Sequence, residues 1–139
     1  NCTLLVNQTI QYSFRNRTIS ITGVDDFIGG SADVETALKE YVKSDHHIIL
    51  NHCPQYCDDI SGHLDQDIKV DFILSGHTHG GQINIFGFVP FLPQGSGEYI
   101  KGWYNDNKPN LYVSKGVGTS IFPARFGARA EIAIFNLTT

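Results

Sequence analysis

Apolar and polar residues alternate along the first part of the chain, which is the pattern of strands that bury one face. The alternation predicts three short strands, over residues 3–6, 9–14 and 17–24. Glycines then interrupt it, and the apolar spacing that follows is helical. We therefore predict a helix over residues 32–43, with Ser31 as its N-cap.

The middle of the chain contains two continuous apolar runs, which predict buried strands. They cover residues 46–50 and 70–74, and each leads directly into a loop that carries histidine. A weaker helical pattern over residues 58–67 lies between them.

The last part of the chain combines short apolar segments with a long turn-rich stretch. Residues 83–88 predict a strand or hairpin arm, and residues 111–117 and 130–137 predict two closing strands. Residues 90–109 are rich in Gly, Pro and Asn, which favours a long surface loop. The sequence therefore predicts a single α/β unit with more strand than helix.

The composition is that of one globular domain. The chain has 139 residues, of which 41% are hydrophobic and 17% charged. A formal net charge of -4 argues against nucleic-acid binding, because such domains usually carry a basic face. The chain lacks methionine even at position 1, so we expect that it is part of a longer protein. No apolar stretch is long enough to span a membrane, and both a membrane-associated and a cytoplasmic parent remain open.

The cysteines and sequons give little functional information. Cys53 and Cys57 could close a small disulfide, and we favour reduced thiols. Four Asn-x-Thr sequons occur, and we attribute them to the frequency of Asn and Thr in strands and turns.

Three histidines follow two of the predicted buried strands. His52 comes after the first, and His77 and His79 come after the second. Neutral imidazole is the commonest protein metal ligand, and the ends of neighbouring strands hold ligands rigidly. An extended segment sends residues i and i+2 to the same side, so we expect His77 and His79 to point into one cleft and Thr78 to point elsewhere.

Residues 76–82 form the motif Gly-His-Thr-His-Gly-Gly-Gln. This motif resembles the last signature of the calcineurin-like metallophosphoesterases, and most closely the branch in which it reads G-H-T-H-G-G-Q. The segments 21–26, 48–54 and 112–120 also resemble that branch, in the same order along the chain. The resemblance therefore covers almost the whole chain.

The resemblance implies the C-terminal half of a four-layer αββα sandwich, a mixed sheet with flanking helices. Residues 1–139 would be the C-terminal part of this domain, with its N-terminal part absent. The family holds two metal ions, manganese, iron or zinc, in a cleft between two sheets. His52 and His77 match ligands of one ion, and His79 matches a ligand of the other. The remaining ligands belong to D-x-H, G-D and G-N-H motifs that the resemblance places upstream.

The implied activity is metal-dependent hydrolysis of a phosphomonoester, phosphodiester or pyrophosphate bond in the intact parent. Its substrate would be a phosphorylated small molecule or a lipid-linked one. We expect the isolated fragment to be inactive, because it lacks several metal ligands and the histidine proposed as proton donor. Arg125 could contact the substrate phosphate or form a structural ion pair. Asn51 and Gln82 are weaker candidates for substrate contact or for orienting the metal ligands.

Other residues carry more open interpretations. For Asp25 and Asp26 we favour a turn or capping role over catalysis. An aromatic set could line a substrate pocket, touch lipid or belong to the core; it comprises Phe86, Phe88, Phe91 and Trp103.

The alternative function is a non-catalytic binding module on the same fold. The three retained histidines weigh against it, because a scaffold does not need them. We also expect sheet edges and apolar faces to be exposed in the fragment. These would favour pairing with the missing N-terminal half or with another copy of the chain.

Overall fold

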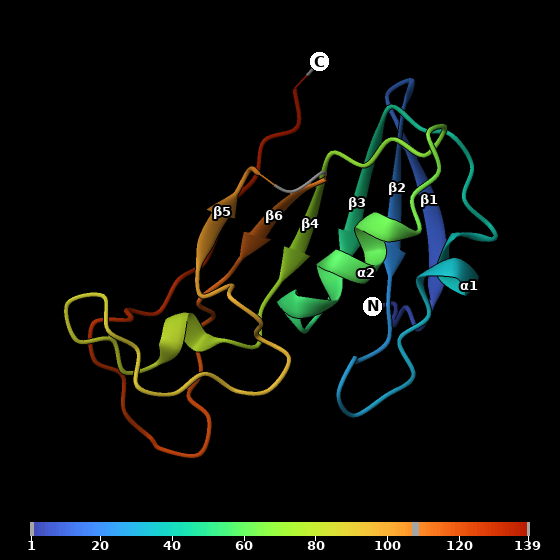
Figure 1. Ribbon diagram of the computed structural model, residues 1–139. Coiled ribbons are helices and arrows are strands. Elements are labelled where there is room, and N and C mark those ends of the chain that lie inside the picture. The colour runs from blue at the N-terminus through green and yellow to red at the C-terminus, as the bar shows by residue number, and fades with distance from the viewer. Residues whose placement is uncertain (1, 107–108, 139) are drawn as a thin grey trace.

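A computed structural model describes residues 2–106 and 109–138 and contains one mixed six-stranded sheet (Figure 1). The strand order across the sheet is β1-β2-β3-β4-β6-β5. The strands are β1 (Gln8–Phe14), β2 (Arg17–Gly23), β3 (His46–Leu50), β4 (Phe72–Ser75), β5 (Gly102–Tyr104) and β6 (Asn110–Val113).

The four central strands, β2, β3, β4 and β6, run parallel, and the edge strands β1 and β5 pair antiparallel to their neighbours. Parallel strands all have their C-terminal ends on the same side of a sheet. The loops that follow β3, β4 and β6 therefore lie together at these C-terminal ends, where the candidate site is found. This arrangement confirms the prediction of an α/β fold with a mixed sheet.

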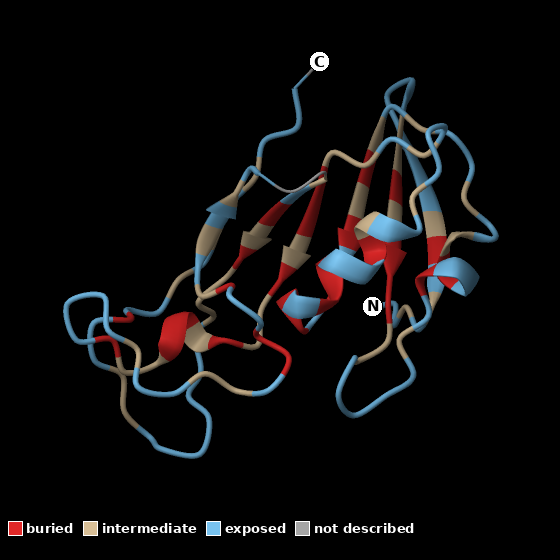
Figure 2. Ribbon diagram, in the orientation of Figure 1, coloured by how far each residue is buried: buried red, intermediate tan, exposed pale blue. Residues whose placement is uncertain are grey.

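Two short helices cover one face of the sheet (Figure 1). Helix α1 (Val34–Leu38) begins after Asp33, whose carboxylate accepts a hydrogen bond from the Thr36 amide at 2.8 Å. Helix α2 (Cys57–Gly62) follows the single 3₁₀ turn η1 (Pro54–Tyr56). The core forms between these helices and the sheet, as the buried positions in Figure 2 show. Its fully buried side chains include Val34, Ile49, Ile60, Ile73 and Leu111.

The predicted helix over residues 32–43 is shorter than expected, and its N-cap is Asp33 rather than Ser31. The helix stops because the amides of Lys39 and Tyr41 bond to carbonyls three residues back, which tightens and ends it. Tyr41 then leaves the helix and stacks on His47 of β3, with ring centroids 4.6 Å apart. The predicted second helix is likewise reduced to α2.

Two predicted strands do not form. Residues 3–6 pass over the end of β2, where a Cβ on Gly23 would lie 2.4 Å from that of Leu5. Residues 130–137 cross the sheet face opposite the helices, where Phe135 packs on Phe72 and Trp103. Tertiary packing thus overrides the local strand pattern in both segments.

Two further predictions are corrected in the loop-rich part of the chain. Residues 83–88, predicted as a strand or hairpin arm, form no regular strand; an antiparallel bridge closes a tight hairpin turn between Ile85 and Phe88, and a parallel bridge joins Ile83 to Phe126. The expected loop over residues 90–109 contains β5, which pairs with β6 at the sheet edge. Three residues are too few for β5 to stand out from its Gly- and Pro-rich surroundings.

Glu131 fixes the segment that crosses the second face. Its carboxylate pairs with Lys115 at 2.6 Å and accepts the Tyr112 hydroxyl at 2.7 Å. Burial opposes ionisation of Glu131, but these hydrogen bonds outweigh it and hold its pKa below the ordinary value. Burial and the bond to Glu131 raise the pKa of Tyr112 to about 12.

The rest of that face remains partly open. Apolar side chains there are exposed by 40–70%, namely Tyr12, Phe14, Leu50 and Trp103. Within residues 2–106 and 109–138, no helix has the length and apolar character needed to cross a membrane.

His47 lies inside the core, with 1% of its surface exposed. A chain of hydrogen bonds runs from its Nε2 to the Thr22 hydroxyl (2.7 Å), on to the Thr9 hydroxyl (2.7 Å), and ends at the Ala37 carbonyl (2.6 Å). Because Thr9 donates to that carbonyl, Thr22 donates to Thr9 and His47 donates to Thr22. Burial disfavours the charged ring, so His47 is neutral with its proton on Nε2, and its buried Nδ1 has no hydrogen-bond partner among the described residues.

We expect the free energy of unfolding to fall as the pH drops from about 6.5 to 4, because burial lowers the pKa of His47 to about 4. The unfolded chain takes up a proton on this ring near pH 6.5, whereas the folded chain resists it, so acid favours unfolding. The loss attributable to His47 should approach about 2–3 kcal/mol. Urea unfolding of the wild type and of His47→Gln at pH 7, 6 and 5 measures it. Equal pH slopes for the two proteins would contradict the prediction.

Candidate metal centre

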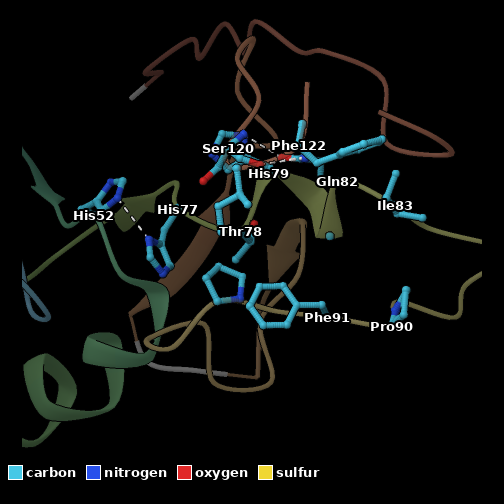
Figure 3. Close-up of a pocket in the computed structure, with 13 residues that line it drawn as sticks. His52, His77, Thr78, His79, Gln82, Ile83, Pro90, Phe91, Ser120 and Phe122 are labelled. Carbon is cyan, nitrogen blue, oxygen red and sulfur yellow. Dashed lines mark hydrogen bonds between the residues drawn. The ribbon is translucent and has the colours of Figure 1, made fainter. Parts of the chain in front are cut away.

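His52 and His77 lie next to each other at the C-terminal ends of the parallel strands. His52 lies two residues beyond β3 and His77 two residues beyond β4, and these strands are parallel neighbours. Nδ1 of His77 lies 3.2 Å from Nε2 of His52, and the two rings are nearly perpendicular with centroids 4.9 Å apart (Figure 3). The topology of the sheet thus brings together two imidazoles that are 25 residues apart in sequence.

The spacing of this pair fits two ligands of one metal ion. Metal–imidazole bonds are about 2.0–2.1 Å long, so two nitrogens about 3 Å apart can share an ion. Within the described residues, no three His, Cys, Asp or Glu side chains group closely enough to hold a metal ion. The chain therefore offers two neighbouring imidazoles, which is fewer than the usual four or more ligands.

The hydrogen bonds of the pair place its protons in the metal-free chain. Nε2 of His77 lies 2.7 Å from the Gln94 carbonyl and donates to it, so Nδ1 of His77 accepts from Nε2 of His52. Partial burial, the main cause, and the proximity of His77 lower the pKa of His52 below its ordinary value. Coordination by both facing nitrogens would require the proton on His52 Nε2 to leave, because only a nitrogen with a free lone pair binds a metal.

The His77–His79 segment is a turn, which corrects the expectation of an extended segment. His77 and His79 adopt positive φ angles of 68° and 52°, and the residue between them is in the right-handed region. The Thr78 side chain is 1% exposed and donates to the Ile100 carbonyl at 2.7 Å, which anchors the turn. A positive φ costs a non-glycine residue about 1–2 kcal/mol, and such strain concentrates at functional sites.

The glycines of the motif are required by this turn. Gly80 and Gly81, within the 3₁₀ turn η2 (His79–Gly81), have φ angles of 65° and 79°. A Cβ on Gly80 would lie 2.6 Å from the Lys115 side chain, and one on Gly81 would lie 2.6 Å from Val89. Both positions therefore need glycine for conformation and for space.

His79 lies apart from the His52–His77 pair. Its Nδ1 is 3.2 Å from the Gly118 carbonyl and 3.2 Å from a terminal nitrogen of Arg125. All three histidines nevertheless line one cavity, His79 at a different part of the wall from the pair (Figure 3). That separation is compatible with the expectation that His79 serves a second ion, which stays a prediction.

The three substrate candidates from the sequence are engaged within the chain. The Gln82 amide bonds to the backbone of Ser120 and Phe122, at 2.7–3.0 Å. Asn51 is 4% exposed and donates to the Cys53 carbonyl at 2.7 Å, and its buried side-chain oxygen has no partner among the described residues. Arg125 contacts four backbone carbonyls besides His79 Nδ1. These contacts suit a supporting role better than direct substrate contact.

Asp25 and Asp26 fold the loop after β2, as the sequence suggested. The Asp26 carboxylate accepts the amides of Ile28 and Gly29, and that of Asp25 accepts the amide of Ser31. The bond from Gly29 is the main cause of the lowered pKa of Asp26. Cys53, a buried thiol 3.7 Å from Asp26, has its pKa raised to about 11 by burial and by that carboxylate. Cys53 and Cys57 are separate thiols, as we favoured.

The cavity beside the histidines has a volume of about 520 Å³ and a mostly apolar wall. The described residues that line it include no Lys, Arg, Asp or Glu. Of the aromatic set, Phe91 lines the cavity, Phe86 and Phe88 are exposed on the adjacent turn, and Trp103 packs against Phe72. Sequence reasoning missed the other apolar wall residues, Ile83, Pro90, Pro93, Ile121 and Phe122. Their loops carry no periodic signal that could have placed them.

The fold and site define an α/β protein with a histidine-lined cavity at the carboxyl ends of its parallel strands. The chain is 37% identical to the uncharacterized protein YpbG of Bacillus subtilis, over 96% of this chain and 47% of the relative. It is 34% identical to the uncharacterized metallophosphoesterase YkuE of Bacillus subtilis, over 86% of this chain and 40% of the relative. Phosphodiesterase YaeI of Escherichia coli is 28% identical over 97% of this chain and 47% of its own length.

These relatives support the assignment of the chain to the metallophosphoesterase family, a family of metal-dependent phosphoesterases. The chain spans less than half the length of each of the three. No family model matches the chain, and no solved structure matches it.

Proposed function

We propose that this chain is the C-terminal part of a metallophosphoesterase that hydrolyses a phosphomonoester, phosphodiester or pyrophosphate bond. The observation that carries the proposal is the His52–His77 pair, whose ring nitrogens lie 3.2 Å apart at the ends of adjacent parallel strands. The similarity to relatives named metallophosphoesterase or phosphodiesterase supports the interpretation of this pair as metal ligands of a phosphoesterase.

In this proposal two metal ions, manganese, iron or zinc, lie at the carboxyl edge of the sheet. Such ions polarise phosphoryl oxygens and supply a hydroxide nucleophile at neutral pH. His52 and His77 would hold one ion, and His79 would contribute to the other. The remaining ligands would come from outside residues 1–139, so the chain alone would be inactive.

The open face of the sheet supports a larger, four-layer sandwich. In the part of the chain that the structure describes, the helices lie on one face, and the other exposes apolar side chains such as Phe14, Leu50 and Trp103. Exposed apolar area of this kind usually belongs to an interface. We propose that a second sheet from the N-terminal part of the same protein covers it, with self-association as the substitute when that part is absent.

The cavity wall indicates the kind of substrate. A phosphate at the histidines would leave the rest of the molecule against apolar residues such as Phe91, Ile121 and Phe122. Such a wall suits a phosphorylated small molecule or lipid-linked substrate with an apolar group. The net charge of -4 gives no support for nucleic acid as a partner.

Metal analysis and hydrolysis assays on the intact protein test the proposal. We expect bound transition metal, hydrolysis of a nitrophenyl phosphodiester or phosphomonoester, loss of activity with a chelator and recovery with Mn²⁺ or Zn²⁺. The 139-residue chain alone should show no turnover. An intact, folded protein that binds no transition metal would instead support a non-catalytic scaffold.

A further inference from the structure

Arg125 uses its entire hydrogen-bonding capacity inside the chain. A guanidinium group has five N–H donors and no acceptor. Nε donates to the Gly118 carbonyl at 2.7 Å. One terminal nitrogen donates to the carbonyls of His79 (3.3 Å) and Ala128 (3.0 Å), and the other to the Lys115 carbonyl (2.7 Å) and His79 Nδ1 (3.2 Å). A phosphate could reach this group only if one of these bonds broke.

Two of the five bonds hold His79, one at its backbone carbonyl and one at its ring. Because arginine only donates, Nδ1 of His79 is the acceptor, and the neutral ring carries its proton on Nε2. The Gly118 carbonyl is also 3.2 Å from Nδ1, but it already accepts from Nε of Arg125. A charge-assisted bond is the stronger of the two, so Arg125 determines the tautomer of the metal-free ring.

Nδ1 of His79 therefore lies between a donor, Arg125, and an acceptor, Gly118, at equal distances of 3.2 Å. Each partner stabilises a different tautomer of the same ring. A change of tautomer removes a proton from Nε2 and adds one to Nδ1, so the ring stays neutral and need not rotate. Nε2, the nitrogen without a role in these contacts, would then carry the lone pair.

We propose that Arg125 is a positioning residue for His79. It holds the ring through Nδ1 in the metal-free protein, and it holds the Gly118 carbonyl in place to accept the Nδ1 proton when Nε2 coordinates a metal ion. Metal-binding histidines commonly donate their other ring nitrogen to a backbone carbonyl, which is the arrangement that Arg125 prepares here. The first half of this proposal stands on the contacts alone, and the second half rests on the proposed function.

Nitrogen NMR of the histidine rings tests the first half on the chelator-treated intact protein. The His79 signal is assigned by its absence in His79→Gln. In the wild type we expect the Nε2–H tautomer, and in Arg125→Gln a mixture of tautomers. The matched control is Arg129→Gln, which removes the same charge from an exposed arginine of the same segment and should leave the wild-type spectrum. An Nδ1–H tautomer in the wild type, or an unchanged His79 signal in Arg125→Gln, overturns the assignment.

Metal titration tests the second half. The loss of a residue that orients a ligand commonly weakens metal binding by about 10–100-fold. We expect that loss in Arg125→Gln for the ion that depends on His79, with Arg129→Gln unchanged. A tautomer effect without any change in metal affinity would overturn the metal part and leave the positioning part intact. Wild-type protein that binds no metal would count against the proposed function instead, because the tautomer experiment does not depend on it. Thermal unfolding of each variant shows whether it is folded.

Discussion

Replacement of His77 by alanine is expected to weaken metal binding by the intact protein by more than about 100-fold, because even residues that only orient a ligand commonly contribute about 10–100-fold. His77 is the better of the paired histidines to remove, since its ring is fixed by Gln94 on one side and faces His52 on the other. Hydrolysis should fall with metal occupancy. Calorimetric titration with Mn²⁺ or Zn²⁺ measures the affinity.

His63→Ala is the matched control for His77→Ala. His63 is an exposed histidine at the end of α2, where its ring bonds to the Asp59 carbonyl, and it does not line the cavity. We expect its loss to leave the metal affinity within a factor of two. If His77→Ala binds metal as tightly as His63→Ala, the 3.2 Å pair is not a metal site.

Replacement of Ile73 by alanine is expected to lower the free energy of unfolding by about 3–4 kcal/mol, because large-to-small changes in a packed core cost about 2–5 kcal/mol. Ile73 is fully buried in the central strand β4, where it lies opposite Ile49 on β3 and Leu111 on β6. Neighbouring strands cannot close the space without losing their pairing. Urea unfolding at pH 7 measures the change.

An exposed isoleucine provides the comparison for this measurement. Ile132 lies in the C-terminal segment and is 83% exposed, so Ile132→Ala should change stability by no more than about 0.5 kcal/mol. The same atoms are removed in both variants, and only the surroundings differ. Equal losses in the two would mean that the core is not where the structure places it.

The sequence predicted those strands and helices whose apolar residues form a clear local pattern. The buried strands around Ile49 and Ile73 were found because their apolar runs are continuous and end in clear loops. The terminal segments around Leu5 and Phe135 have the same local pattern but lie across the sheet, since packing on Gly23 and Phe72 decides their path. Local alternation cannot tell a paired strand from an extended segment that covers one.

For the site, the sequence predicted that His77 and His79 face one cleft, and both line the same cavity. The extended backbone assumed for this prediction is wrong, because both residues adopt positive φ angles within a turn. The contacts of Arg125 could not be predicted either, because most of its partners are backbone carbonyls. Every residue has such a carbonyl, so the sequence gives no sign of which ones an arginine will bind. Contacts of this kind become visible only with the tertiary structure.

The hydroxyl chain beneath α1 has a consequence for how strand β1 finds its alignment. Thr9 and Thr22 face each other across the β1–β2 pair, and their bond continues to His47 on β3. A slip of β1 by one residue would turn Thr9 to the opposite face of the sheet. The Thr22 hydroxyl and the Ala37 carbonyl would then each lose a hydrogen-bond partner in the apolar core. The opposite face of β1 carries the apolar residues Ile10, Tyr12 and Phe14, whose contacts are compatible with several alignments. The hydrogen bonds of Thr9 therefore determine the register of β1.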